Sequence, residues 1–148
     1  MKQILHILLI ALMLMGFYSC VPKTELASPD GHIKVAFTAD TDGKMMYRVT
    51  VNDTLLLDNS PLGFEAKDGI DLNRGFRVVS TVFTDKDEIW TQPWGENKTN
   101  RNHYNEMAVL LKNAANVELT LRFRAFDDGV AFRYEYEVPG VDSLLITD

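Results

Sequence analysis

Residues 117–126 read VELTLRFRAF and residues 130–138 read VAFRYEYEV, with Asp-Asp-Gly at 127–129 between them. Apolar residues occupy alternate positions in both segments, which is the period of two expected of a half-buried β-strand. An Asp-Gly step between two such segments is strong hairpin chemistry, because both residues tolerate the backbone conformations of a tight turn. We therefore predict an antiparallel β-hairpin over residues 117–138.

The two faces of this hairpin differ in chemistry. One face is apolar and aromatic throughout, with Val117, Leu119, Leu121, Phe123, Val130, Phe132, Tyr134, Tyr136 and Val138. The other carries charges that can pair between neighbouring strands, namely Arg122, Arg124, Arg133, Glu135 and Glu137. We expect the apolar face, Phe132 included, to cover a core.

The same period of two recurs along most of the chain after residue 31. It predicts strands at 32–40, 45–51, 54–59, 62–66, 75–84 and 104–113, with turns at Asp42-Gly43 and Asn52-Asp53. No segment of this part has a sustained helical period, so the fold class is predicted to be all-β, an antiparallel β-sandwich over residues 32–148. Residues 143–147 (SLLIT) begin a further strand with no evident partner, so we expect the sandwich to be incomplete at its C-terminus and the chain to be a fragment of a longer protein.

The N-terminus has the features of an export signal. Residues 1–20 contain Lys2, then an apolar run from Ile4 to Met15, and end at Cys20, the only cysteine of the chain. This pattern predicts a signal helix rather than a membrane span, because the run is too short and wrongly flanked. The position of Cys20 is similar to that of the lipidated cysteine in bacterial lipoproteins. We expect lipidation at Cys20, export to the periplasm, a lipid anchor in the outer membrane and a tether at 21–31; the alternative is simple cleavage.

Composition and motifs exclude several function classes. The formal net charge of −6 and the scattered basic residues argue against nucleic acid as a partner. The three histidines and one cysteine have no metal-ligand spacing, and phosphate-binding or dinucleotide-binding loops are not present in the sequence. Neighbouring carboxylates at Asp85/Asp87/Glu88, Asp127/Asp128 and Glu135/Glu137 are interpreted as a loop cluster, a turn and a solvated strand face. No catalytic residue, metal ligand or cofactor site is predicted in this chain.

One segment has the chemistry of sugar recognition. Residues 89–106 read IWTQPWGENKTNRNHYNE, in which two tryptophans precede a run of amide and charged side chains. Sugar hydroxyls need paired donors and acceptors, and the C–H faces of sugar rings stack on aromatic rings. We interpret the segment as a long polar loop with these candidate carbohydrate-binding or interface residues: Trp94, Glu96, Arg101, Asn102, Tyr104, Asn105 and Glu106. The alternatives are a surface loop whose tryptophans Trp90 and Trp94 plug the core, and ion pairs that Arg101 and Glu106 form with each other or with the surface of a neighbouring domain.

Four stretches together resemble one known family. They are SPDGHIKV (28–35), SPLGFEA (60–66), WTQPWGENKTNRNHYNEMAV (90–109) and LRFRAFDDGVAFRYEYEV (121–138). The resemblance is to the N-terminal domain of glycoside hydrolase family 97, and it covers residues 28–148. It implies a supersandwich like that of galactose mutarotase, packed against a catalytic (β/α)8 barrel.

The resemblance also implies a function for the longer protein. Enzymes of the family are exo-acting on α-glucosides or α-galactosides, with catalytic carboxylates in the barrel and a calcium ion held largely by Glu residues. The calcium ligand of the N-terminal domain is expected beyond Asp148, so we assign none here. We expect the chain to be non-catalytic by itself and to help form the carbohydrate site with the barrel domain. The alternatives are a stand-alone carbohydrate-binding lipoprotein and a structural remnant without ligand.

Overall fold

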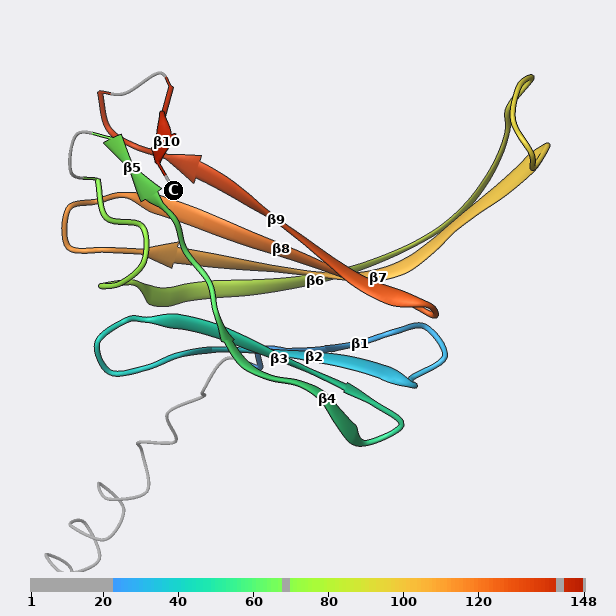
Figure 1. The fold of residues 1–148 in the computed structure, drawn as a ribbon, viewed down its shortest axis with the longest axis horizontal. Coiled ribbons are helices and arrows are strands. Elements are labelled where there is room, and N and C mark those ends of the chain that lie inside the picture. Colours follow the sequence, from blue (N-terminus) through green and yellow to red (C-terminus); the bar gives the residue numbers. More distant parts are fainter. Residues whose placement is uncertain (1–22, 68–69, 141–142, 148) are drawn as a thin grey trace, which may run out of the picture.

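The computed structural model describes residues 23–67, 70–140 and 143–147. These residues form β-strands in antiparallel ladders and no α-helix, which confirms the predicted all-β sandwich (Figure 1). The strands are β1 (Glu25–Ala27), β2 (Ile33–Ala39), β3 (Met45–Val51), β4 (Thr54–Pro61), β5 (Glu65–Ala66), β6 (Arg77–Thr91), β7 (Thr99–Lys112), β8 (Glu118–Phe126), β9 (Gly129–Glu137) and β10 (Ile146–Thr147). Within the same residues, no helix is long and apolar enough to cross a membrane.

Two four-stranded sheets make up the sandwich. The N-terminal sheet has the order β1-β2-β3-β4, and the C-terminal sheet has the order β6-β7-β8-β9. Each strand pairs with its neighbour in the sequence, so hairpins build both sheets. The turn between β3 and β4 shows how local chemistry allows this, because Asn52 and Asp53 both adopt positive φ angles, of 50° and 60°. Asn and Asp tolerate this left-handed conformation better than most other residues.

The predicted hairpin at 117–138 is present as β8 and β9. Phe126 pairs with Gly129 around a turn at Asp127 and Asp128, and the register runs back to Glu118 opposite Glu137. Along β8, the buried residues alternate with half-buried ones, as a strand with one core-facing side requires. The hairpin therefore supplies both an apolar face to the core and a charged face on the outside of the sandwich.

The core lies between the two sheets. Its largest fully buried side chains are Val35, Phe37, Met45, Leu72, Met107, Val109, Leu111, Leu119, Leu121 and Phe123. Phe37 of the N-terminal sheet and Phe123 of the C-terminal sheet meet with ring centroids 6.1 Å apart. Contacts of this kind join the sheets into one hydrophobic unit.

The sandwich is open on the side where β4 and β9 form the edges of the two sheets. A cleft of about 760 Å³ lies there, and its lining includes Tyr47, Val49, Leu57, Val130 and Phe132. Phe132 keeps 39% of its surface exposed. The expectation that Phe132 is a core residue is therefore wrong, because the edge position of β9 leaves one side of its ring exposed in the cleft while the other contacts Tyr47 and Phe123.

Two predicted boundaries also need correction. The tether expected at 21–31 contains strand β1, whose Leu26 enters the core. Three residues are too few to show a periodic pattern. Ile146 pairs with Ala66 and Thr147 with Glu65, so the strand in SLLIT has a partner in β5, and the expectation of a strand without one is wrong. The expected signal segment and Cys20 lie outside the described residues.

Candidate functional site

The segment singled out for sugar recognition is part of a long two-stranded projection. Strands β6 and β7 pair continuously from Arg77 opposite Lys112 to Thr91 opposite Thr99, apart from a bulge near Val79. Strand β8 pairs with β7 only as far as Asn105 opposite Ala125. Residues 86–104 therefore extend beyond β8 as a hairpin that curves away from the sandwich, and we call them the arm (Figure 1).

The interpretation of residues 89–106 as a long loop is correct only at 92–98, and it is wrong at 89–91 and at 99–106. Residues 99–106 belong to β7, and the acidic residues at 85–88, interpreted as a loop cluster, belong to β6. Only residues 92–98, at the tip of the arm, lie between the two strands. The sequence hid these strands because both faces of the arm are exposed to water, and such a ribbon needs no alternation of polar and apolar residues.

The tip of the arm presents tryptophan to solvent. Trp94 is 85% exposed and Trp90 is 49% exposed, so the alternative in which both rings plug the core is wrong. Glu96 is also exposed at the tip. Gly95 has a φ of 125°, and a Cβ there would come within 2.5 Å of Gln92 Nε2. The tip conformation thus requires glycine beside the exposed ring of Trp94.

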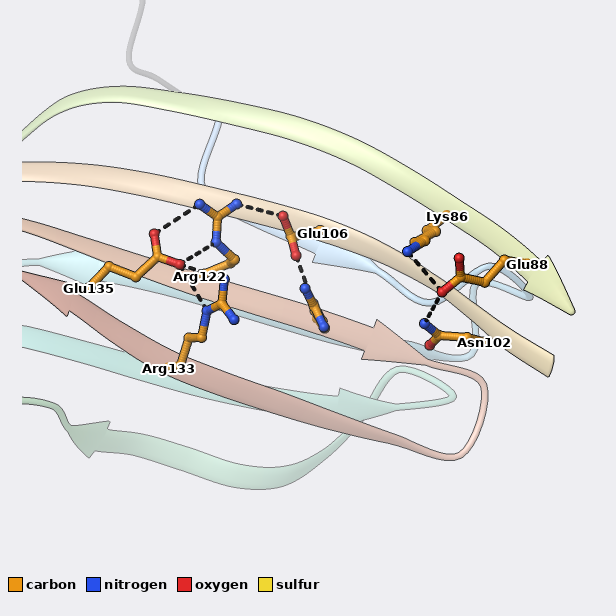
Figure 2. Close-up of polar contacts among 8 residues, drawn as sticks. Lys86, Glu88, Asn102, Glu106, Arg122, Arg133 and Glu135 are labelled. Carbon is orange, nitrogen blue, oxygen red and sulfur yellow. Dashed lines mark hydrogen bonds and ion pairs between the residues drawn. The ribbon is translucent and has the colours of Figure 1, made fainter. Parts of the chain in front are cut away.

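Cross-strand polar pairs hold the middle of the arm. Arg101 donates from Nε and Nη2 to the two oxygens of Asp87, each at 2.8 Å. On the opposite face, Asn102 donates to Glu88 Oε1 at 2.9 Å, and Lys86 lies 2.8 Å from the same oxygen (Figure 2). The hydrogen bond from Arg101 lowers the pKa of Asp87, so the pair stays charged at neutral pH. The hypothesis of an ion pair between Arg101 and Glu106 is wrong, because each has other partners.

At the root of the arm, Tyr104 is enclosed by β8. Its ring centroid lies 5.2 Å from that of Phe126, and the guanidinium of Arg124 sits 4.5 Å above it. The neighbouring Asn105 donates from Nδ2 to the backbone oxygen of Ala27 at 3.0 Å. Tyr104 is buried and Asn105 is half-buried, so both serve packing at this point in the fold.

Glu106 is the centre of an ionic network on the outer face of the C-terminal sheet. It is 7% exposed and accepts hydrogen bonds from Arg122 Nη1 at 2.6 Å and Arg124 Nε at 2.7 Å. Arg122 also makes two hydrogen bonds of 2.9 Å to Glu135, which Arg133 contacts from the same strand (Figure 2). The predicted cross-strand charge pairing on this face is thereby confirmed.

Electrostatics keep both carboxylates of the network ionised. Burial by itself raises the pKa of Glu106, but the hydrogen bonds from Arg124 and Arg122 lower it overall. The hydrogen bonds from Arg122, against the opposing effect of burial, and from Arg133 lower the pKa of Glu135 to about 2. Every strong acceptor position of these groups already faces a guanidinium, so the network is built to stabilise the sheet rather than to transfer protons.

The structure thus divides the seven candidate residues into two groups. Trp94, Glu96, Arg101 and Asn102 lie on the arm beyond the edge of β8, and Tyr104, Asn105 and Glu106 lie at its root with partners inside the sandwich. Sequence reasoning missed the partners Asp87, Arg124 and Phe126. The period of two could have indicated one of these partners. Glu106 and Arg124 both occupy outward-facing positions of their strands, and they lie directly opposite each other.

The described residues offer no complete metal site. No three His, Cys, Asp or Glu side chains among them lie close enough together to hold an ion. Asp127 and Asp128 form the β8–β9 turn as predicted, and the side-chain Oδ1 of Asp127 accepts a hydrogen bond from the backbone N–H of Asp30 at 3.0 Å.

Comparison with known proteins identifies the family. Residues 26–148 match the family described as Glycosyl-hydrolase 97 N-terminal. This sandwich with its projecting arm is therefore of the N-terminal domain type of family 97 glycoside hydrolases, and the chain belongs to that family. The resemblance inferred from the four sequence stretches is confirmed.

Solved structures agree with this assignment. A family 97 enzyme from Pseudoalteromonas sp. strain K8 in complex with acarbose is 31% identical, with a TM-score of 0.77 over 83% of this chain and 19% of that enzyme. An enzyme of the same family and organism in complex with panose is 32% identical, with the same TM-score and the same coverage of both chains. A β-arabinopyranosidase is 26% identical, with a TM-score of 0.68 over 74% of this chain and 17% of that enzyme. The chain spans about a fifth of the length of these enzymes.

Proposed function

We propose that this chain is a non-catalytic N-terminal portion of an exo-acting glycoside hydrolase for α-glucosides or α-galactosides, and that its arm borders the carbohydrate site. The observation that carries the proposal is Trp94, a large aromatic ring that is 85% exposed at the end of a projecting hairpin. A domain gains no stability from a ring that stays in water, and tryptophan is enriched at binding surfaces because its ring is apolar and its N–H is a donor. The acarbose and panose bound by the Pseudoalteromonas enzymes support a sugar as the ligand.

The arm carries both kinds of contact that a sugar needs. Trp94 offers a flat apolar face and Glu96 an acceptor at the tip, while Arg101 on one face of the ribbon and Asn102 on the other offer donors. The Arg101–Asp87 and Asn102–Glu88 hydrogen bonds orient these side chains before any ligand arrives. We expect the catalytic barrel to supply the rest of the site and the reacting carboxylates, with calcium bound by residues outside 23–147.

The test is a chimera in which residues 25–147 replace the matching N-terminal region of the Pseudoalteromonas enzyme. Changing Trp94→Ala should lower kcat/KM for an α-glucoside at least tenfold, equivalent to about 1.4 kcal/mol of transition-state stabilisation. The matched control is Ile89→Ala, which removes another apolar side chain that is 67% exposed on the same arm. Equal activity of Trp94→Ala and the unmodified chimera would contradict the proposal.

A stand-alone carbohydrate-binding protein is the second candidate, because the same exposure of Trp94 would serve it. Calorimetric titration of the isolated chain with panose separates the two. We expect no binding at millimolar sugar, since the arm offers only one wall of a site. Binding that depends on Trp94 would support the stand-alone function.

We also propose export and lipidation at Cys20, motivated by the apolar run that ends at this residue. Cells fed a labelled fatty acid should label the protein, and Cys20→Ala should abolish the label. An unlabelled protein recovered from the periplasm would leave only simple secretion.

A further inference from the structure

Three consecutive residues mark the point where β7 leaves the sheet. In chain order, Asn105 is the first residue of β7 that pairs with β8. Residues 99–104, which precede it, pair with β6 alone. Successive residues of a strand point to opposite faces. Asn105 therefore points toward the N-terminal sheet, and Tyr104 and Glu106 point outward.

On the inner face, Asn105 ties the root of the arm to the other sheet. Its side-chain amide donates to the backbone oxygen of Ala27, 78 residues away in sequence and on β1. Strand β1 is itself fixed, because Leu26 is buried in the core and β1 pairs with β2. This hydrogen bond is thus a direct polar link between the sheets at the start of the arm.

On the outer face, Glu106 ties the same point of β7 to β8. The two guanidinium groups that bind it come from Arg122 and Arg124, two positions apart on β8. The guanidinium of Arg124 also contacts the arm itself, because it lies over the ring of Tyr104. Charge-assisted hydrogen bonds to a buried carboxylate have stricter geometry than apolar packing, so they fix an angle as well as a distance.

The length of the arm amplifies any movement at this point. From Asn105 to Thr99, β7 runs six residues, or about 20 Å at about 3.3 Å per residue. A tilt of about 10° at the root would therefore displace the tip by about 3–4 Å, enough to remove a ring from contact with a sugar.

We propose that Asn105 and Glu106 are positioning residues that clamp β7 from both faces and set the angle of the arm against the sandwich. The clamp is a property of this chain and needs no ligand; its relevance to the carbohydrate site rests on the proposed function. Both residues were predicted as candidate carbohydrate-binding or interface residues, and the clamp assigns them a different task. They hold the arm that presents Trp94.

The experiment measures the angle directly, without any sugar. Spin labels on Asn97→Cys at the tip and Thr54→Cys on β4, in a protein carrying Cys20→Ser, report the distance between arm and sandwich by pulsed electron resonance. Asn105→Ala and Glu106→Gln should each shift the mean distance by about 3 Å or broaden its distribution by that amount, and the double variant should do so further.

Two controls separate the clamp from general loss of packing. Asn102→Ala removes an arm hydrogen bond beyond the root, and Lys112→Ala removes a pair between β7 and β8 at the far end of the same strands. Both should leave the distance unchanged. If Glu106→Gln does not fold, Arg124→Gln removes one of its two partners while Arg122 stays in place. Unchanged distances in the folded root variants, or equal shifts in the controls, would overturn the proposal. A Trp94→Ala enzyme with full activity would overturn the sugar contact and leave this result untouched.

Discussion

Strands β6 and β7 run through both the body of the sandwich and the arm, but different forces hold the two regions. In the body, Met107, Val109 and Leu111 of β7 are fully buried against the other sheet. In the arm, the same strand offers Arg101 and Asn102 to cross-strand partners in water. Burial of a large apolar side chain contributes about 1.5–3 kcal/mol, whereas exposed ion pairs contribute little. The difference teaches that stability lies in the body and that the arm contributes little to it.

The largest expected effect on stability comes from the aromatic cluster of the body, in which a buried ring and an edge ring can be compared. Phe123 is fully buried and its ring lies 5.8 Å from that of Phe132, which is 39% exposed. Phe123→Ala should lower the free energy of unfolding by about 3–5 kcal/mol. Phe132→Ala should cost about 1–2 kcal/mol, because part of its ring already contacts water. Urea denaturation of the two variants checks the order, and equal losses would show that the open side of the sandwich is closed in solution.

The next effect compares two glutamates of the same face. Glu106→Gln should lower the free energy of unfolding by about 2–3 kcal/mol, because it leaves two guanidinium groups with a weaker acceptor at a buried position. Glu88→Gln, on the arm, should leave the denaturation midpoint unchanged within error. A similar loss of unfolding free energy for both variants would mean that the polar pairs of the arm stabilise the fold as much as those of the body.

The body of the sandwich could be predicted from the sequence better than the arm. The hairpin at 117–138 was predictable in register and turn, because one of its faces meets a core and the alternation records that contact. The arm was predicted as a loop, because a ribbon exposed on both faces selects residues for pairing and function instead. Its two acidic partners for Arg101 and Asn102, in β6, lie 14 residues from them and follow no local pattern.

The candidate site shows the same limit. Trp94, Glu96, Arg101 and Asn102 were found by their chemistry, and the structure places them on one projection. Tyr104, Asn105 and Glu106 have the same polar and aromatic chemistry, yet their partners Phe126, Ala27 and Arg122 lie in other strands. Composition identifies such a segment, but only the fold separates side chains that are exposed to solvent from side chains that anchor the strand.

Acid should weaken the body through its ionic network. The pKa of Glu135 is lowered to about 2 from an ordinary 4.5, and that of Glu106 is lowered as well. A carboxylate with a lowered pKa stabilises the folded state above its unfolded pKa and loses that contribution as the pH falls through the folded value. The free energy of unfolding should therefore decline between about pH 5 and pH 2. Glu135→Gln should flatten this decline, and an unchanged profile would remove the network from the stability of the sheet.

The smallest expected effect belongs to the arm. Arg101→Ala breaks two hydrogen bonds of 2.8 Å to Asp87, but the side chains of Arg101 and Asp87 are 56% and 50% exposed. Exposed pairs of this kind are weakened by water and salt, so the denaturation midpoint should not move measurably. Amide exchange of residues 99–103 should nevertheless accelerate, because the pair holds the two strands of the arm together. A large drop in the midpoint would make the arm part of the stability core.

The most direct test removes the arm and keeps the body. Asp87 and His103 pair directly across β6 and β7, so Asn-Gly in place of residues 88–102 would close a tight turn between them. In the chimera with the Pseudoalteromonas enzyme, we predict that kcat/KM for an α-glucoside falls more than tenfold while the denaturation midpoint of the isolated chain stays unchanged. Full activity without the arm, or collapse of the sandwich on its removal, would contradict the division of stability and function between the two regions.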